Sequence, residues 1–371
     1  MREGWTYKKL GEVCNTITDG SHNPPKGIEC SEYRMISSQN VFDDEIRITN
    51  DNVRFLTKED HYKEDKRTKL SKDVVLLTIV GTIGRACVLK GTEGFITLQR
   101  SVAALHPSAD ICPRFLMYVL IGNRNKLESE AHGIAQRGIY LRQLSELEVP
   151  VPKLSVQQSI IEELDKINEL INLKKAQLSD YDALSQSIFY EMFGDPVTNE
   201  KRWQVNELGK VCELKAGKNI KASELSEMPA EGLYPCFGGN GIRGYIAKKS
   251  HTGSYPIIGR QGALCGNVNM ATGTFYATEH AVVCTPSNLL IPLFLFYVLR
   301  EMNLNQHATG VAQPGLAVSN ITPLPIVLPP IPLQQSFAAR ITAIENQKQR
   351  ISSTIKDLET LLASRMQYWF D

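Results

Sequence analysis

The chain has 371 residues, of which 42% are hydrophobic and 22% are charged, and its formal net charge is +1. This composition indicates a folded protein of two or three domains and argues against extended disorder. The near-neutral charge argues mildly against a protein that binds nucleic acid without help, but it leaves room for a local basic strip.

Several protein classes are disfavoured by the distribution of particular residues. The eight cysteines include no Cys-x-x-Cys pair and no adjacent histidine cluster, so we expect reduced, mostly buried thiols and no zinc site. The longest apolar runs, such as 291–299, are too short to cross a bilayer, and the first residues contain no apolar signal region. We therefore expect a cytoplasmic protein that makes no contact with a membrane.

Residues 1–152 are predicted to form a mixed domain. A loop rich in Gly, Asn and Pro covers 18–25, and β-prone runs between glycines predict strands at 74–80 and 85–89. A short helix is predicted at 113–122, where proline occupies the first position.

Residues 153–193 are predicted to form a long helix. Apolar side chains recur at heptad spacing, and the motif Gly194-Asp195-Pro196 ends the helix. The part from Ser155 to Phe193 is roughly 58 Å long at 1.5 Å per residue. The predicted interface positions of this helix are Leu164, Ile167, Ile171, Leu178, Tyr181 and Ile188.

Residues 194–329 are predicted to form a second mixed domain, with strands at 255–258 and 281–284 and a helix at 292–302. Residues 330–371 are predicted to form a second long helix. Its interface positions are Ile341, Ile344, Ile351, Ile355, Leu358 and Leu362. We expect the two helices to pair in antiparallel orientation, because each must bury its apolar seam. Packing of each helix on its own domain, or in a homodimer, is the alternative.

The two halves of the chain are copies of one unit. Trp5 and the run from Leu10 to Cys14 match Trp203 and the run from Leu208 to Cys212, and Gln157-Gln158-Ser159 matches Gln334-Gln335-Ser336. The offset falls from 198 to 177 residues between these matches, so the first copy is longer by 21 residues, nearly all before Gly81. The copies agree at their ends and diverge at 15–80 and 213–258. We expect these stretches to set what each copy binds.

Side chains suited to base edges gather at turns and at matching places in the two copies. Glycine beside arginine or glutamine also lets backbone approach phosphate groups. The candidate DNA-binding residues of the first copy are His22, Asn23, Lys26, Arg85, Gln99, Arg100, Gln136, Arg137 and Tyr140. Those of the second copy are Asn240, Arg243, Arg260, Gln261, His280 and Gln313.

Motifs of catalysis are missing from the sequence. There is no Gly-x-x-x-x-Gly-Lys-[Ser/Thr] loop, no His-Glu-x-x-His and no Gly-x-Ser-x-Gly. We expect no catalytic residue, metal ligand or cofactor in this chain. Two alternatives stay open: a methyltransferase with unrecognised motifs, which would bind S-adenosylmethionine by itself, and a coiled-coil scaffold that binds only protein and does not read DNA.

The duplicated Trp-to-Cys opening, the Pro-x-x-x-x-Gln-Gln entry to each long helix and the junction Met192-Phe193-Gly194-Asp195-Pro196 resemble the specificity (S) subunit of type I restriction-modification enzymes. The resemblance spans almost the whole chain. It implies an α+β protein with two similar mixed α/β target recognition domains, joined by two long antiparallel coiled-coil helices in pseudo-two-fold symmetry.

The same resemblance implies a function. Each recognition domain would read one half of a split, asymmetric site in double-stranded DNA, and the helices would fix the spacing of the halves. Two methylation (M) subunits that bind S-adenosylmethionine, and restriction (R) subunits that use ATP and Mg²⁺, would be separate chains. No base-contacting residue carries over by position, because the family has no fixed recognition motif.

Overall fold

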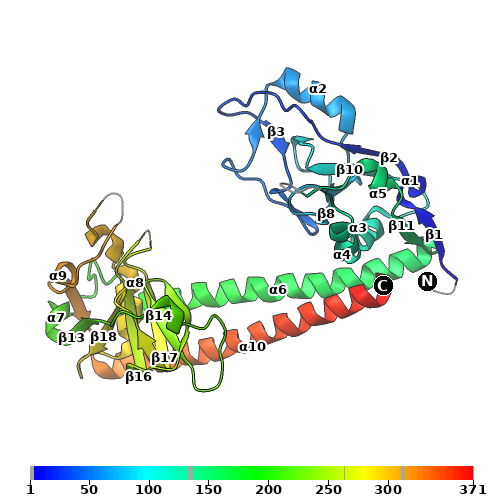
Figure 1. Cartoon of the computed structure of the whole chain (residues 1–371). Helices are drawn as coiled ribbons and strands as arrows, with labels where there is room; N and C mark the ends of the chain where they lie inside the picture. Colours follow the sequence, from blue (N-terminus) through cyan, green and yellow to red (C-terminus); the bar gives the residue numbers. More distant parts are fainter. Residues whose placement is uncertain (1–3, 133–136, 263, 311–313, 371) are drawn as a thin grey trace. The chain divides into compact units, whose positions relative to one another are not determined.

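The computed structural model describes residues 4–132, 137–262, 264–310 and 314–370. The chain divides into two compact units: unit 1 comprises Met1–Lys174 and Thr354–Asp371, and unit 2 comprises Lys175–Ser353. Figure 1 colours the chain from blue to red and labels its elements. Each unit contains a globular part and a portion of both long helices, α6 (Leu154–Phe193) and α10 (Ile331–Phe370).

Unit 1 is built from several small sheets with helices packed on them. Its strands are β1 (Thr6–Lys9), β2 (Cys14–Asp19), β3 (Tyr33–Ile36), β4 (Val41–Phe42), β5 (Glu45–Ile46), β6 (Arg54–Phe55), β7 (Val75–Thr78), β8 (Ala86–Val88), β9 (Phe95–Leu98), β10 (Val102–Pro107) and β11 (Glu148–Val151). Its short helices are α1 (Leu10–Val13), α2 (Lys58–Thr68), α3 (Pro113–Gly122), α4 (Arg124–Ser129) and α5 (Leu141–Ser145). The sheets are ordered β2-β10-β7-β8, β6-β3-β9, β1-β11 and β4-β5.

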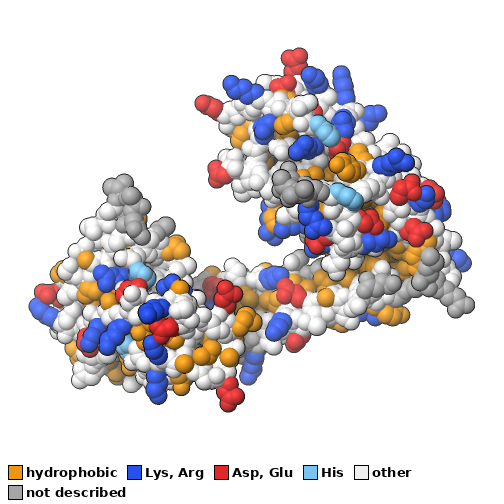
Figure 2. Space-filling view, in the orientation of Figure 1, with side chains coloured by type: hydrophobic (Ala, Val, Ile, Leu, Met, Phe, Trp, Pro, Cys, Tyr) orange, Lys and Arg blue, Asp and Glu red, His pale blue; other side chains and the backbone are white. Residues whose placement is uncertain are grey.

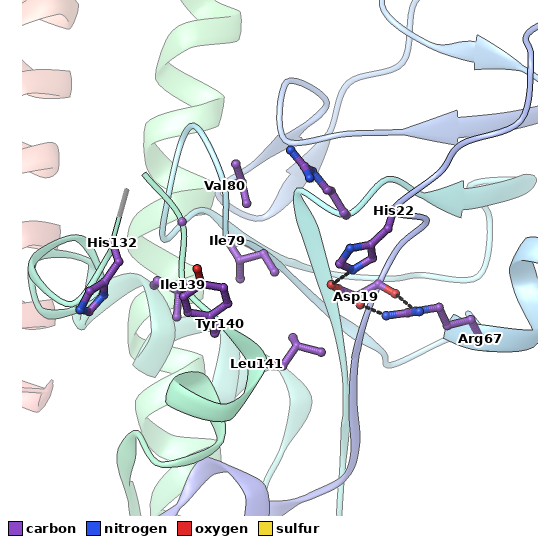
Figure 3. Close-up of a pocket in the computed structure, with 11 residues that line it drawn as sticks. Asp19, His22, Arg67, Ile79, Val80, His132, Ile139, Tyr140 and Leu141 are labelled. Atoms are coloured by element: carbon purple, nitrogen blue, oxygen red, sulfur yellow. Dashed lines mark hydrogen bonds and ion pairs between the residues drawn. The ribbon is translucent and has the colours of Figure 1, made fainter. Parts of the chain in front are cut away.

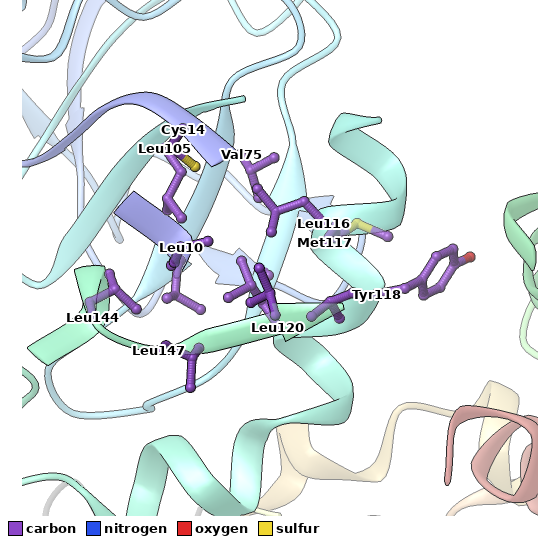
Figure 4. Close-up of a cluster of buried hydrophobic side chains, with 14 of the residues drawn as sticks. Leu10, Cys14, Val75, Leu105, Leu116, Met117, Tyr118, Leu120, Leu144 and Leu147 are labelled. Atoms are coloured by element: carbon purple, nitrogen blue, oxygen red, sulfur yellow. The ribbon is translucent and has the colours of Figure 1, made fainter. Parts of the chain in front are cut away.

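The main core of unit 1 lies between the four-stranded sheet and helices α1, α3, α5 and α6. Leu10, Leu120, Leu144 and Leu147 lie together in this core and are almost fully buried (Figure 4). The strands predicted at 74–80 and 85–89 are confirmed as β7 and β8, and the predicted helix at 113–122 is α3. Because α3 is apolar on most of its surface, it is enclosed by the sheet on one side and other helices on the other.

Unit 2 has one larger sheet in place of the small sheets. Its strands are β12 (Gln204–Glu207), β13 (Cys212–Ala216), β14 (Tyr234–Gly238), β15 (Gly241–Ile246), β16 (His251–Gly259), β17 (Val268–Ala277), β18 (Ala281–Pro286) and β19 (Pro325–Leu328). Its helices are α7 (Leu208–Val211), α8 (Pro292–Glu301), α9 (Val318–Ile321) and the 3-10 turns η1 (Ala222–Glu224) and η2 (Leu304–His307). The main sheet is ordered β13-β18-β16-β17-β14-β15, and β12 pairs with β19.

The frame of the two units is the same. In unit 1 the first strand of the domain, β1, pairs with the last strand, β11. In unit 2 the first strand, β12, pairs with the last strand, β19, in the same antiparallel arrangement. A β-carbon on Gly11 would lie 3.3 Å from the Ser145 side chain, and one on Gly209 would lie 2.3 Å from that of Thr322. Helix α1 therefore packs closely against Ser145 in unit 1, and α7 packs closely against Thr322 in unit 2. Glycine in both copies leaves room for these contacts.

Each unit contains a stretch of α6 running beside a stretch of α10. In unit 1, Glu163 near the start of α6 accepts hydrogen bonds from Arg365 and Trp369 at the end of α10. In unit 2, Lys348 in α10 forms an ion pair of 2.6 Å with Asp182 in α6. At the end of α6 in unit 2, the Phe193 ring lies 5.3 Å from the ring of Phe337 near the start of α10. The start of one helix therefore meets the end of the other in both units, so the pairing is antiparallel. Both helices also join the core of the domain beside them.

The predicted seam positions are buried or half-buried, although the seam also contains a charged residue. Leu164, Ile167, Ile171, Ile341, Ile344, Ile351 and Ile355 are buried, and Leu178, Tyr181, Ile188, Leu358 and Leu362 are half-buried. Lys348 also occupies the seam. Burial alone would lower the pKa of its ammonium group, but hydrogen bonds to Asp182 and Glu345 outweigh this effect and raise the pKa.

A fully buried glutamine ties the start of each long helix to its domain. Gln157 Oε1 accepts a hydrogen bond from the Cys112 backbone at 2.8 Å, and its Nε2 donates to the carbonyls of Asp110 and Pro152 at 3.0 and 2.9 Å. Gln334 makes the same three bonds in unit 2, to Ile291, Leu289 and Pro329. This duplicated arrangement is the physical basis of the first glutamine in each Gln-Gln pair.

The β4–β5 hairpin lies in the stretch where the two copies diverge, and it is anchored by Arg114. The Arg114 guanidinium donates to Asp165 at 2.6 Å and to both carboxylate oxygens of Asp44 at 2.8 Å. Asp44 lies in the turn between β4 and β5, and Asp165 lies on α6. The second residue of α8 is Leu293, so the equivalent helix of unit 2 has no arginine at this position. Arg114 therefore connects this hairpin to α6, which both copies share.

Replacing Arg114 with methionine is expected to destabilise unit 1 by about 2 kcal/mol, because it leaves two partly buried carboxylates without their cation. Urea unfolding would measure the loss, and hydrogen exchange is expected to rise at 41–46 before it rises in α3. The control is Arg47→Met, since Arg47 pairs with Glu45 at the exposed surface and no change is expected there. Equal effects of the two substitutions would contradict the anchoring role.

Candidate nucleic-acid interface

Unit 1 contains a hollow at the end of β2, lined by three of the residues predicted to contact DNA: His22, Arg100 and Tyr140. Its other lining residues are Asp19, Arg67, Ile79, Val80, His132, Gly138, Ile139 and Leu141. Figure 3 shows Asp19 between His22 and Arg67, with Ile79, Ile139 and Leu141 across the hollow. The hollow thus has charged side chains on one side and apolar side chains on the other.

Asp19 is the centre of the charged side. Its side chain is almost fully buried, and its Oδ2 lies 2.6 Å from His22 Nε2. Arg67 Nε donates to the Asp19 backbone carbonyl at 2.8 Å, and Arg67 Nη2 donates to Oδ1. Both carboxylate oxygens are therefore engaged within the protein. The groups that remain exposed at this place belong to the histidine and the arginine.

A glycine brings the loop of His22 against the loop of Arg100. A β-carbon on Gly20 would lie 2.1 Å from the Leu98 carbonyl oxygen, so only glycine fits. The Arg100 backbone N–H donates to the Ser21 carbonyl at 3.0 Å, and Ser21 forms a parallel bridge with Gln99. Gly217 makes the same close approach to the Ala277 carbonyl in unit 2, which duplicates the turn.

Other predicted residues of unit 1 lie outside this hollow. Arg85 stacks on the ring of Phe42 at 4.8 Å, and Arg137 donates to the Glu128 carbonyl at 2.7 Å. Asn23 and Lys26 are exposed in the loop after His22, and Gln99 is half-buried. Gln136 lies outside the described residues.

In unit 2 the predicted residues gather around the turn between β14 and β15. A β-carbon on Gly239 would lie 3.4 Å from the His280 carbonyl and 3.5 Å from the Gln261 carbonyl, so three loops meet here. Arg260 N donates to the His280 carbonyl at 3.0 Å, and Asn240 accepts from Asn267 at 3.1 Å.

Arg243 completes this group. It is exposed on β15, just after the turn. Gln313 lies outside the described residues.

Unit 2 also buries polar atoms at this place. His280 Nε2 lies 3.0 Å from Glu279 Oε1. Within the described part of the chain, Arg260 Nε, Glu279 Oε2 and His280 Nδ1 are buried and have no hydrogen-bond partner. Each unit therefore brings an acid, a histidine and an arginine together. They are Asp19, His22 and Arg67 in unit 1, and Glu279, His280 and Arg260 in unit 2, and they do not occupy matching sequence positions.

The two sites are not copies. In unit 1, Asp19 pairs with Ala103 in β10, and in unit 2, Ala216 pairs with Val282 in β18. These strands are equivalent in the shared frame, so the carboxylate that organises unit 1 is replaced by alanine in unit 2. The polar residues differ where the backbone frame is the same.

Sequence reasoning missed Asp19 and Arg67. Arg67 lies on α2, a highly charged helix in the stretch where the two copies diverge, so no match in the second copy marked it. Asp19 lies within the Gly/Asn/Pro-rich loop that the sequence singled out. The pairing of the two residues depends on how α2 packs beside β2, and no short-range pattern reports that.

The described residues offer little for catalysis. Within the described ranges, no three His, Cys, Asp or Glu side chains converge to hold a metal ion. Burial raises the pKa of the Cys14 thiol to about 12 and that of Cys236 to about 11, so neither is a reactive thiolate near neutral pH.

Figure 2 shows basic and acidic side chains interspersed on both globular parts of the face drawn. None of the described helices combines the length and apolar character that crossing a bilayer requires.

Comparison with known families gives a match over most of the chain. The family described as the type I restriction modification DNA specificity domain matches residues 2–180 and again residues 200–360. The chain belongs to this family. It contains two copies of the family's domain, which confirms the internal repeat and the resemblance stated from the sequence.

Individual relatives agree with this assignment. The specificity subunit of the type I restriction enzyme EcoprrI from Escherichia coli is 41% identical over 195 residues, which is 51% of this chain and 48% of that protein. A putative type I specificity subunit, MjaX of Methanocaldococcus jannaschii, is 21% identical over 97% of this chain and 93% of its own. The chain spans about half the length, or less, of several relatives that it matches.

The fold is also shared with a solved specificity subunit. The type I restriction-modification S subunit of M. genitalium matches with a TM-score of 0.60 and 15% identity, over 99% of this chain and 96% of that one. At this low identity the likeness concerns the fold alone. It agrees with the α+β architecture of two specificity domains and long paired helices.

Proposed function

We propose that the chain is the DNA-reading subunit of a type I restriction-modification complex. Each domain reads one half of a bipartite, asymmetric site in double-stranded DNA. The observation that carries this proposal is the repeat itself: two copies share a backbone frame, while the polar residues at equivalent turns differ, as at Asp19 and Ala216. A repeated frame with unlike polar groups suits two different half-sites better than a palindrome.

We infer that the chain has no catalytic role of its own. Methyl transfer would be performed by separate methylation subunits, two per chain, which bind S-adenosylmethionine, and cleavage by restriction subunits that use ATP and Mg²⁺. The relatives are named as specificity subunits of restriction enzymes, and one fold match with a TM-score of 0.59 comes from work on complex assembly of a type I restriction-modification system. The modest net charge agrees, because partner subunits can supply part of the phosphate contacts.

The experiment is a genome-wide map of methylated adenines in host cells with and without this chain. We expect deletion to remove one two-part motif, which would reveal both half-sites and the spacer. An unchanged map would contradict DNA reading and would favour a protein scaffold.

The purified chain alone is expected to transfer no methyl group and to bind no S-adenosylmethionine. Equilibrium dialysis with the labelled compound tests this directly. The matched control is the same chain mixed with its methylation subunits, for which activity is expected. Methyl transfer by the chain alone would instead support an unrecognised methyltransferase.

A further inference from the structure

The hollow of unit 1 presents arginine and histidine nitrogens, and the carboxylate among its lining residues, Asp19, is buried. His22 and Arg67 have side chains 54% and 50% exposed, while Asp19 is 9% exposed and both its oxygens are engaged by them. Arg100 is exposed at the same hollow. A ligand that enters here therefore meets arginine and histidine nitrogens beside an apolar wall.

The exposed arginines at this hollow favour some bases over others. In the major groove, guanine offers two acceptors, N7 and O6, which match the fork of an arginine. Adenine offers an acceptor and a donor, and suits an asparagine or glutamine amide. Cytosine offers the N4 donor, which suits a carboxylate, but the Asp19 side chain is only 9% exposed and each of its oxygens already has a partner within the protein. Of the base edges, the hollow fits guanine best.

Arg100 is the side chain best placed to make the bidentate contact. Arg67 already uses Nε and Nη2 on Asp19, so one edge of its guanidinium is occupied. The Arg100 side chain makes no hydrogen bond or ion pair with the residues that the structure describes, and its backbone is held by the bond to Ser21 at 3.0 Å. A fixed main chain with an available guanidinium is the arrangement that base reading requires.

We propose that Arg100 reads a guanine in the half-site of unit 1, and that Asp19 is a positioning residue that holds His22 and Arg67 beside that base. This inference rests on the proposed function and names one base and one side chain within it. Unit 2 has alanine in place of Asp19, so its half-site is read by a different set of groups.

The test uses the full chain assembled with its methylation subunits, with a duplex of its methylated motif and duplexes that carry every single-base change in both halves. Arg100→Ala and Arg100→Lys are compared with the unaltered chain. We expect one G·C pair of one half to lose roughly 10- to 100-fold in discrimination in both variants, because lysine keeps the charge but lacks the fork. The other half provides an internal control, and its preferences should not change.

Other results would overturn the inference. A uniform loss of affinity for all duplexes in Arg100→Ala, largely restored in Arg100→Lys and weakened by salt, would make Arg100 a phosphate contact. A retained preference at every position of both halves would exclude Arg100 as a reader. If the unaltered complex discriminated among no duplexes at all, the proposed function itself would fail.

The positioning role is tested separately with Asp19→Asn and His22→Ala. Both are expected to reduce discrimination at the same G·C pair that Arg100→Ala affects, by a smaller factor, and to leave the other half unchanged. Overall destabilisation would instead lower binding to all duplexes equally. Reduced discrimination at some other base pair would contradict the placement of His22 and Arg67 beside the base that Arg100 reads.

Discussion

Replacing Gln157 with alanine is expected to lower the free energy of unfolding of unit 1 by about 3 kcal/mol. The side chain is fully buried and holds three backbone groups, of Cys112, Asp110 and Pro152. Its loss leaves these groups without partners inside the protein, and each unsatisfied buried group costs about 1–3 kcal/mol. The three costs are not additive, because water can enter the space that the shortened side chain leaves. Urea unfolding followed by hydrogen exchange within each unit would measure the effect.

The adjacent glutamine supplies a matched control. Gln158 is exposed, and among the described residues its side chain bonds only to Glu162 on its own helix. Gln158→Ala should therefore change stability by less than about 0.5 kcal/mol. Gln334→Ala should destabilise unit 2 as Gln157→Ala destabilises unit 1, and the two effects should add because the sites lie in separate units. Similar losses from Gln157→Ala and Gln158→Ala would show that the buried hydrogen bonds do not anchor the helix.

Inserting seven residues into both long helices is expected to abolish methylation of the original site and to create methylation of a site with a longer spacer. The natural insertion points are the boundaries between the units, after Lys174 in α6 and after Ser353 in α10. One heptad preserves the apolar seam and adds roughly 10 Å, equivalent to about three base pairs at 3.4 Å each. This result follows if the helices set the separation of the half-sites. Methylome sequencing of cells that carry the altered chain measures both the half-sites and the spacer.

A heptad in one helix alone is the control for this experiment. It places seven residues of α6 opposite no added residues of α10, so the two seams cannot both remain paired, and methylation of any two-part site should fall sharply. Methylation with the original spacer after the double insertion would mean that the helices do not act as a ruler. If the half-site sequence changed while the spacer stayed the same, this would contradict the assignment of base reading to the domains and of spacing to the helices.

The sequence alone determined the organisation of this protein. The sequence predicted both long helices to within a residue or so of α6 and α10, because an apolar seam sustained over several heptads is typical of a long paired helix. The matching ends of the two copies revealed the repeat, and the proline-first helices were recognised because proline at the first helical position is a local signal. These features depend on residues close together in the chain.

The tertiary structure decided how the interface is built. Asp19 meets Arg67 across 48 residues of sequence, and Arg114 meets Asp44 across 70, so no spacing rule connects them. The exposed Gln158 and the buried Gln157 are neighbours of the same type, and only the packing of α6 distinguishes them. Of the nine DNA-contact candidates in the first copy, the fold places His22, Arg100 and Tyr140 in one hollow and Arg85 away from it. Side chains converge on a site through long-range packing, and a single sequence carries no record of which distant groups that packing brings together.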